Sequence, residues 1–197
     1  PAQGQGSTAR TTRPLEMPEG NFGQLVISEP NGTKRTLETR KLSVRVNVQG
    51  RMARTEVEQI FYNPTPRQTE GTFTFRLPHG SAIVRLAMEI NGKLIEGELV
   101  ERTRARAIYE SIVRRMKDPA LLEWQGGNRF RTQIFPIPAR GTKRIIIGYE
   151  HVLAGSPGTV DYVYHLARAK AGPHIGQFDF RLKLKGASGL QVLPYDA

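Results

Sequence analysis

The chain has 197 residues, and its 29 Lys and Arg against 18 Asp and Glu give a formal net charge of +11. A chain of this length buries a sizeable core, which excludes disorder throughout. Cysteine is absent, which excludes disulfides, thiolate metal sites and cysteine nucleophiles. Apolar runs reach only three residues, whereas a membrane-spanning helix needs about 20, so no such helix is expected. A surface this basic attracts polyanions or acidic proteins.

The first twenty residues differ in composition from the rest of the chain. Residues 1–20 carry many Gln, Gly, Ser, Thr and Arg and almost no apolar side chains, which predicts a flexible leader. The sequence leaves two origins open for this segment. It either follows a removed signal peptide or begins where a longer chain was cut.

The next part of the chain, residues 42–100, predicts two β-hairpins. Alternating apolar residues over 42–48, the pair Gly50-Arg51 and a second alternating run to residue 61 predict strands joined by a type II′ turn. That register places Val44 opposite Val57 and Arg45 opposite Glu56. In the second hairpin, Asn91-Gly92 forms a type I′ turn between 82–90 and 93–100. Met88 is then opposite Ile95, and Arg85 opposite Glu98.

One helical pattern interrupts the strands. Apolar residues at positions 105, 108, 109, 112, 113 and 116 form a stripe with helical spacing. Thr103 is a suitable N-cap and Pro119 ends the segment, so an amphipathic helix is predicted over about 103–117. Strands are predicted again over 128–134, 142–153, 160–166, 175–184 and 190–193. Many short strands with turn signals predict a mainly β sandwich or barrel.

No catalytic or ligand motif emerges. The four histidines lack zinc-binding spacing, and two of them, His151 and His165, are expected at the surface or a sheet edge. Phosphate-binding, nucleophile-elbow and calcium-loop motifs are absent. We therefore expect no enzyme, no cofactor and no metal.

Basic residues gather in three groups. The group on and around the predicted helix is the candidate surface for an anionic partner, and it consists of Arg102, Arg104, Arg106, Arg114, Arg115 and Lys117. The second group consists of Arg129, Arg131, Arg140, Lys143 and Arg144. The third, on the exposed face of a strand, consists of Arg181, Lys183 and Lys185. The predicted helix places its only aromatic residue, Tyr109, in the apolar stripe, and the third group alternates with leucines, so specific nucleic-acid binding is not expected. A basic domain that binds polyanions, either acidic glycan or nucleic acid, remains the alternative to a protein partner.

The ordered motifs resemble the VIT domain, the module of vault protein and inter-alpha-trypsin inhibitor heavy chains. They include the alternating run from Leu42 to Gly50, the positions Ala53, Thr55, Val57, Gln59, Phe61 and Asn63, and the segments Phe75-Arg76-Leu77-Pro78, Asp118-Pro119-Ala120-Leu121-Leu122-Glu123-Trp124 and Phe135-Pro136-Ile137-Pro138. The resemblance covers roughly residues 25–153. It implies an antiparallel β-sandwich over 21–154, with the helix packed on it, that acts as a non-enzymatic protein-interaction module.

The resemblance also implies a larger architecture. Such modules usually precede a von Willebrand factor type A domain, whose D-x-S-x-S loop does not occur here. We therefore expect the front part of a larger protein of adhesion or complex assembly, with residues 155–197 adding strands toward the missing domain. The expected partner is that type A domain or an acidic protein. An exported location (periplasmic, cell-surface or secreted) is favoured over the cytoplasm.

Overall fold

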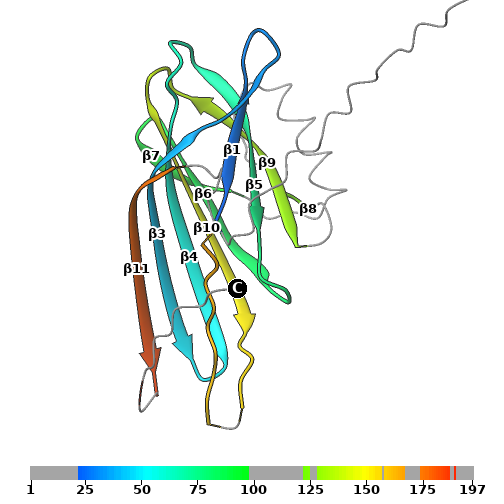
Figure 1. The fold of residues 1–197 in the computed structure, drawn as a ribbon, viewed down its shortest axis with the longest axis vertical. Helices are drawn as coiled ribbons and strands as arrows, with labels where there is room; N and C mark the ends of the chain where they lie inside the picture. Colours follow the sequence, from blue (N-terminus) through cyan, green and yellow to red (C-terminus); the bar gives the residue numbers. More distant parts are fainter. Residues whose placement is uncertain are drawn as a thin grey trace, which may run out of the picture.

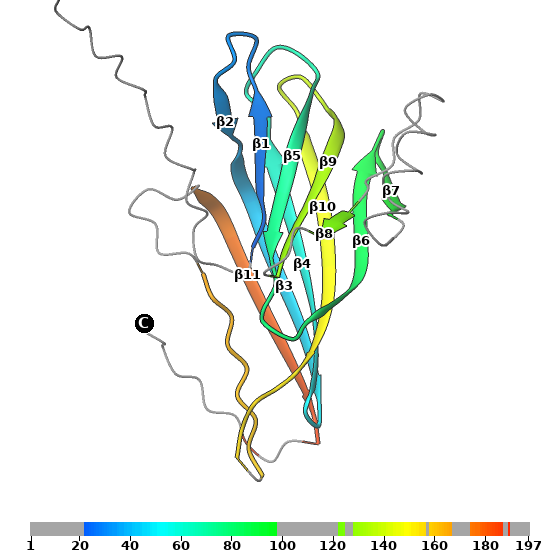
Figure 2. The same cartoon turned by 90° about the vertical axis from the view of Figure 1, so that its right-hand side faces the viewer.

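The fold consists of two facing β-sheets. The computed structural model describes residues 22–97, 122–124, 128–156, 158–166, 174–186 and 189. Within these residues there are strands and no helix, and the two layers are visible in Figures 1 and 2. The expectation of a mainly β fold with two layers is confirmed, whereas the predicted helix over 103–117 lies outside the described residues.

The strands divide into a five-stranded sheet A and a six-stranded sheet B. Sheet A has the order β2-β1-β5-β9-β8 and contains β1 (Gln24–Ser28), β2 (Lys34–Thr36), β5 (Thr69–Arg76), β8 (Leu122–Trp124) and β9 (Arg129–Ile137). Sheet B has the order β11-β3-β4-β10-β6-β7 and contains β3 (Glu38–Gln49), β4 (Met52–Tyr62), β6 (Ala82–Ile90), β7 (Lys93–Glu96), β10 (Thr142–Val152) and β11 (Ile175–Lys185).

Local turn chemistry sets the register of both predicted hairpins. In the first, Gly50 has φ 57°, and β3 pairs with β4 so that Arg45 is opposite Glu56, as predicted. In the second, Asn91 and Gly92 have φ 51° and 75°, the positive values that a type I′ turn requires. β6 then pairs with β7 with Met88 opposite Ile95, also as predicted. Glu98, the predicted partner of Arg85, lies outside the described residues.

The core lies between the sheets. Alternate residues of the long central strands face inward, and the valines at 44, 46 and 57 are at most 1% exposed. Aromatic rings join the layers: Phe61 of β4 meets Phe73 of β5 with centroids 6.0 Å apart, and Phe75 of β5 meets Tyr149 of β10 at 6.1 Å. Each fully buried side chain of this kind contributes about 1.5–3 kcal/mol by leaving water.

The expectation of an antiparallel sandwich is wrong at one edge. β11 pairs with β3 in parallel, with Phe178 opposite Leu42 and Leu184 opposite Val48. A parallel pair needs a crossover connection rather than a hairpin. Here the chain leaves the far end of β10, returns through residues 158–166, and enters β11 from the end at which β3 begins (Figure 1). The two strands therefore run in the same direction.

The returning segment 158–166 is held by side chains. A strand was predicted over 160–166, but these residues join neither sheet. Among the described residues, their β-type pairing is an isolated bridge between Ala154 and Asp161. Tyr162 and Tyr164 pack against the core. The Tyr162 hydroxyl lies 2.9 Å from Oγ1 of the buried Thr55, and burial raises the pKa of this tyrosine. The segment thus covers part of the inner face of sheet B.

Candidate interaction surfaces

The outer face of sheet B carries a lattice of ion pairs across five strands. Arg45 of β3 forms ion pairs with Glu56 and Glu58 of β4, with N–O distances of 3.0 and 3.2 Å. Arg144 of β10 lies 2.8 Å from Glu58. Arg85 of β6 lies 2.5 Å from Glu56 and 2.6 Å from Glu96 of β7. Three arginines face three glutamates, so this outer-face lattice has no net charge and offers little to an anionic partner.

The lattice also shifts protonation equilibria. Hydrogen bonding to Arg85 holds the pKa of Glu96 below its ordinary value, and the same contact, with that to Glu56, raises the pKa of Arg85. Both shifts favour the charged forms, because each ion is closest to its counterion. These residues therefore stay ionised and paired at neutral pH.

The edge strand β11 carries cations that the lattice does not use. Arg181, Lys183 and Lys185 project from one face of β11 and are exposed. Among the described residues no carboxylate forms an ion pair with them, whereas Asp179, further back on the same strand, lies 3.3 Å from Lys41. Alternate side chains of a strand lie about 6.6 Å apart. We call these three residues the β11 cation row.

The opposite face of β11 is apolar. Phe178 and Phe180 are each 41% exposed, while Leu182 and Leu184 pack against the core. Phe180 meets Tyr162 and Tyr164 with ring centroids 6.4 and 6.0 Å apart. Phe178 in turn lies 6.4 Å from Phe180 between ring centroids, so both rings lie at the margin of the inner layer, where part of each reaches solvent.

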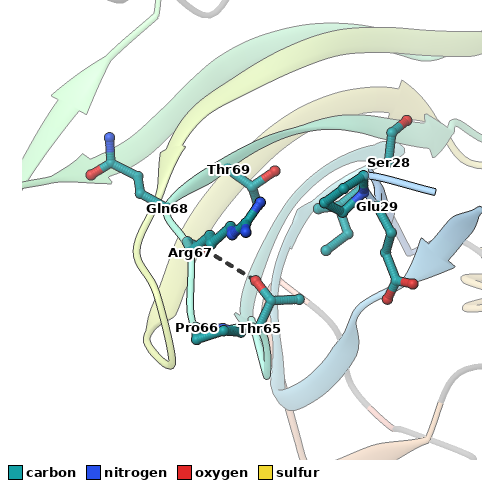
Figure 3. Close-up of a pocket in the computed structure, with 9 residues that line it drawn as sticks. Ser28, Glu29, Thr65, Pro66, Arg67, Gln68 and Thr69 are labelled. Carbon is teal, nitrogen blue, oxygen red and sulfur yellow. Dashed lines mark hydrogen bonds between the residues drawn. The ribbon is translucent and has the colours of Figure 1, made fainter. Parts of the chain in front are cut away.

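A pocket of about 340 Å³ lies at one end of the molecule, between the β1–β2 turn and the β4–β5 loop. Figure 3 shows Ser28 and Glu29 on one side and Thr65, Pro66 and Arg67 on the other. Its wall is mostly apolar, and the Glu29 carboxylate already has Arg35 as its partner. We therefore regard the pocket as secondary to β11.

Asn63 sets the shape of the β4–β5 loop. Its side chain is fully buried, and Nδ2 donates to the carbonyl oxygens of Arg67 at 3.0 Å and Pro138 at 2.9 Å. Its Oδ1 accepts from the backbone N–H and the hydroxyl of Thr65, at 3.0 and 2.8 Å. One side chain thus ties the β4–β5 loop to the turn between β9 and β10. Sequence reasoning noted Asn63 only as part of a motif.

The structure places the three predicted basic groups in different environments or outside the described residues. The candidate surface of Arg102, Arg104, Arg106, Arg114, Arg115 and Lys117 lies outside the described residues, so it stays a prediction. The second group is not a patch, because Lys143 is buried and Arg144 is paired with Glu58. The third group, the β11 cation row, is exposed as predicted.

His151 was expected at the surface or a sheet edge, and the structure gives it intermediate exposure near the end of β10. It is partly buried, with rings of Tyr149 and Tyr162 at 6.0 and 5.9 Å, and burial lowers its pKa. The alternation of β10 turns it toward the same side as Tyr149. The apolar positions before it were the signal that could have predicted this.

Two kinds of feature are absent from the described residues. No group of three or more His, Cys, Asp or Glu side chains in that part of the chain is placed to hold a metal ion. Among the same residues, no helix has the length and hydrophobicity that crossing a bilayer requires.

Comparisons with known proteins give three human relatives. Inter-alpha-trypsin inhibitor heavy chain H6 is 30% identical over 125 residues, 63% of this chain and 10% of the relative. Heavy chain H2 is 24% identical over 67% of this chain and 14% of the relative. Heavy chain H4 is 26% identical over 81% of this chain and 17% of the relative. The chain therefore spans a small part of the length of each relative.

The family model of the vault protein inter-alpha-trypsin domain matches residues 39–149. The match begins in β3, ends in β10 and includes both predicted hairpins and Asn63. That model describes a family of non-catalytic modules. With more than half of its residues matched, this chain belongs to the vault protein inter-alpha-trypsin (VIT) domain family.

Proposed function

We propose that this chain is a non-enzymatic interaction module that works within a longer polypeptide and binds an acidic protein surface, with a downstream von Willebrand type A domain as the first candidate. The observation that carries the proposal is the division of charge on sheet B. The outer-face lattice is neutral, whereas the β11 cation row lacks carboxylate partners among the described residues.

A further observation and a general principle support this function. The relatives are inter-alpha-trypsin inhibitor heavy chains that are many times longer than the matched segment, which favours a module beside other domains. Charge complementarity also speeds encounter and selects among partners. Since the relatives are heavy chains of this inhibitor family, an exported location is part of the proposal.

The direct test is binding between this chain and the remainder of its own full-length polypeptide, produced separately. Calorimetric titration at about 50 mM and 200 mM salt should give saturable one-to-one binding that weakens as the salt rises, because exposed charges are screened. Absence of binding at both salt concentrations overturns this function.

The second candidate function is polyanion binding, and the net charge of +11 together with the β11 cation row favours it. Binding to a heparin fragment should then lose affinity linearly on a double-logarithmic salt plot, because counterions are released. A flat salt dependence with weak binding removes this candidate. Stronger binding to heparin than to the remainder of the polypeptide would rank it first.

A further inference from the structure

The outer edge of β11 has no partner strand among the described residues. β11 stands at the end of the strand order and hydrogen-bonds to β3, and no other described strand pairs with it. It is eleven residues long and contains no proline, so a row of amide and carbonyl groups faces outward. Such an edge is a template for another strand.

Its side chains select which strand can pair. Antiparallel pairing of two copies of β11 centred on Lys183 would place Lys183 opposite its own equivalent and Arg181 opposite Lys185, and like charges directly opposite destabilise a sheet. A strand with carboxylates at every second position would instead place one anion beside each cation, at the same spacing of about 6.6 Å. The cation row therefore disfavours self-pairing in that register and favours pairing with an acidic strand.

The other face of the edge favours the same partner. Phe178 and Phe180 present their partly exposed rings on the side away from the cation row. The residues that alternate with the carboxylates of an incoming strand would lie against these rings if they were apolar. An alternating acidic and apolar segment satisfies the backbone edge, the cations and the rings together.

We infer that β11 is a docking edge for an extended segment of a protein partner in which Asp or Glu alternates with apolar residues. The segment adds to sheet B as a seventh strand beside β11. This inference rests on the proposed function and deepens it, since it names the surface used and the chemistry of the partner.

The probe is a labelled, end-capped peptide that alternates Glu and Val over seven residues, titrated into the full chain at about 100 mM salt, near the physiological range. Three comparison ligands separate the effects of charge sign, of alternation and of a peptide backbone. They are the same peptide with Lys for Glu, a Glu-Glu-Val-Val rearrangement of equal charge, and a heparin fragment. We expect the alternating peptide to bind at least fivefold more tightly than the rearranged one. Hydrogen exchange should slow at alternate amides of β11.

A matched pair of variants tests the location. The double variant Lys183→Glu, Lys185→Glu should weaken peptide binding at least tenfold. The double variant Lys34→Glu, Lys93→Glu makes the same change of charge on β2 and β7 and should stay within twofold of the wild type. Circular dichroism checks that each variant is folded, and Arg181→Gln serves if the first double variant is not.

Three results overturn the inference. Equal binding of the alternating and rearranged peptides, or tighter binding of heparin with no protection of β11, identifies a diffuse charge patch. No binding of any acidic ligand means that β11 is not a docking edge for an acidic strand. Binding to the remainder of the polypeptide that survives Lys183→Glu, Lys185→Glu leaves the proposed function standing and removes β11 from it.

Discussion

Replacing Asn63 by Asp tests how the two loops at the pocket end are held. The substitution keeps the shape of the side chain but converts Nδ2, which donates at 3.0 and 2.9 Å, into an oxygen facing the same two carbonyls. A typical hydrogen bond contributes about 0.5–1.5 kcal/mol net, so two lost bonds cost about 1–3 kcal/mol, and a carboxylate directed at two carbonyl oxygens adds about 1 kcal/mol. We expect a loss of about 2–4 kcal/mol in the free energy of unfolding at neutral pH.

The assay is urea unfolding followed by circular dichroism. Asn47→Asp, an identical chemical change on the exposed face of β3, is the control and should stay within about 0.5 kcal/mol of the wild type. The introduced carboxyl has its pKa raised in the folded state, so the folded chain binds the proton more readily. The deficit of Asn63→Asp should therefore shrink as pH falls. Equal stabilities of the two variants, or a deficit that grows in acid, would refute the role assigned to the Asn63 amide.

Two further predictions concern charge. Glu58→Gln should lower the free energy of unfolding by about 1–2 kcal/mol, because Arg45 and Arg144 lose their shared anion, and this loss should shrink in high salt. Glu70→Gln, on the exposed part of β5, is the control. An equal loss of stability in both variants would contradict the role of the outer-face lattice. Because burial lowers the pKa of His151, the unfolded chain binds protons more readily, so stability should fall as pH drops below the ordinary histidine value of 6.5. His151→Phe should flatten that part of the pH profile, measured by chemical unfolding at each pH, and a profile that stays equally steep in this variant would contradict the assignment.

The parts of the fold that the sequence predicted are those encoded by neighbours along the chain. The β3–β4 register followed from Gly50 and from opposite charges at Arg45 and Glu56, both within one hairpin. The parallel pairing of β11 with β3 did not follow, because alternation identifies a strand but not the strand beside it. Likewise, residues 160–166 alternate as a strand does, yet side chains such as Tyr162 hold them in place of a backbone ladder.

The candidate surfaces divide in the same way. Exposure of the β11 cation row followed from its alternation with Leu182 and Leu184. The neutralisation of Arg144 was hidden, because it depends on β4 lying beside β10. The role of Asn63 was hidden as well, since one of its acceptors is the carbonyl of Pro138 in a distant turn.

The parallel placement of β11 has a consequence for the order of synthesis. A ribosome completes β3, β4 and β10 well before β11, so the edge of β3 in a nascent chain has no partner strand until β11 has been synthesised. A fragment cut at residue 149, where the family match stops, keeps that condition permanently and also lacks the tyrosines that cover sheet B. Expression of the module is therefore best planned around residue 186 or later, since the boundary of a family match is not the boundary of its folding unit.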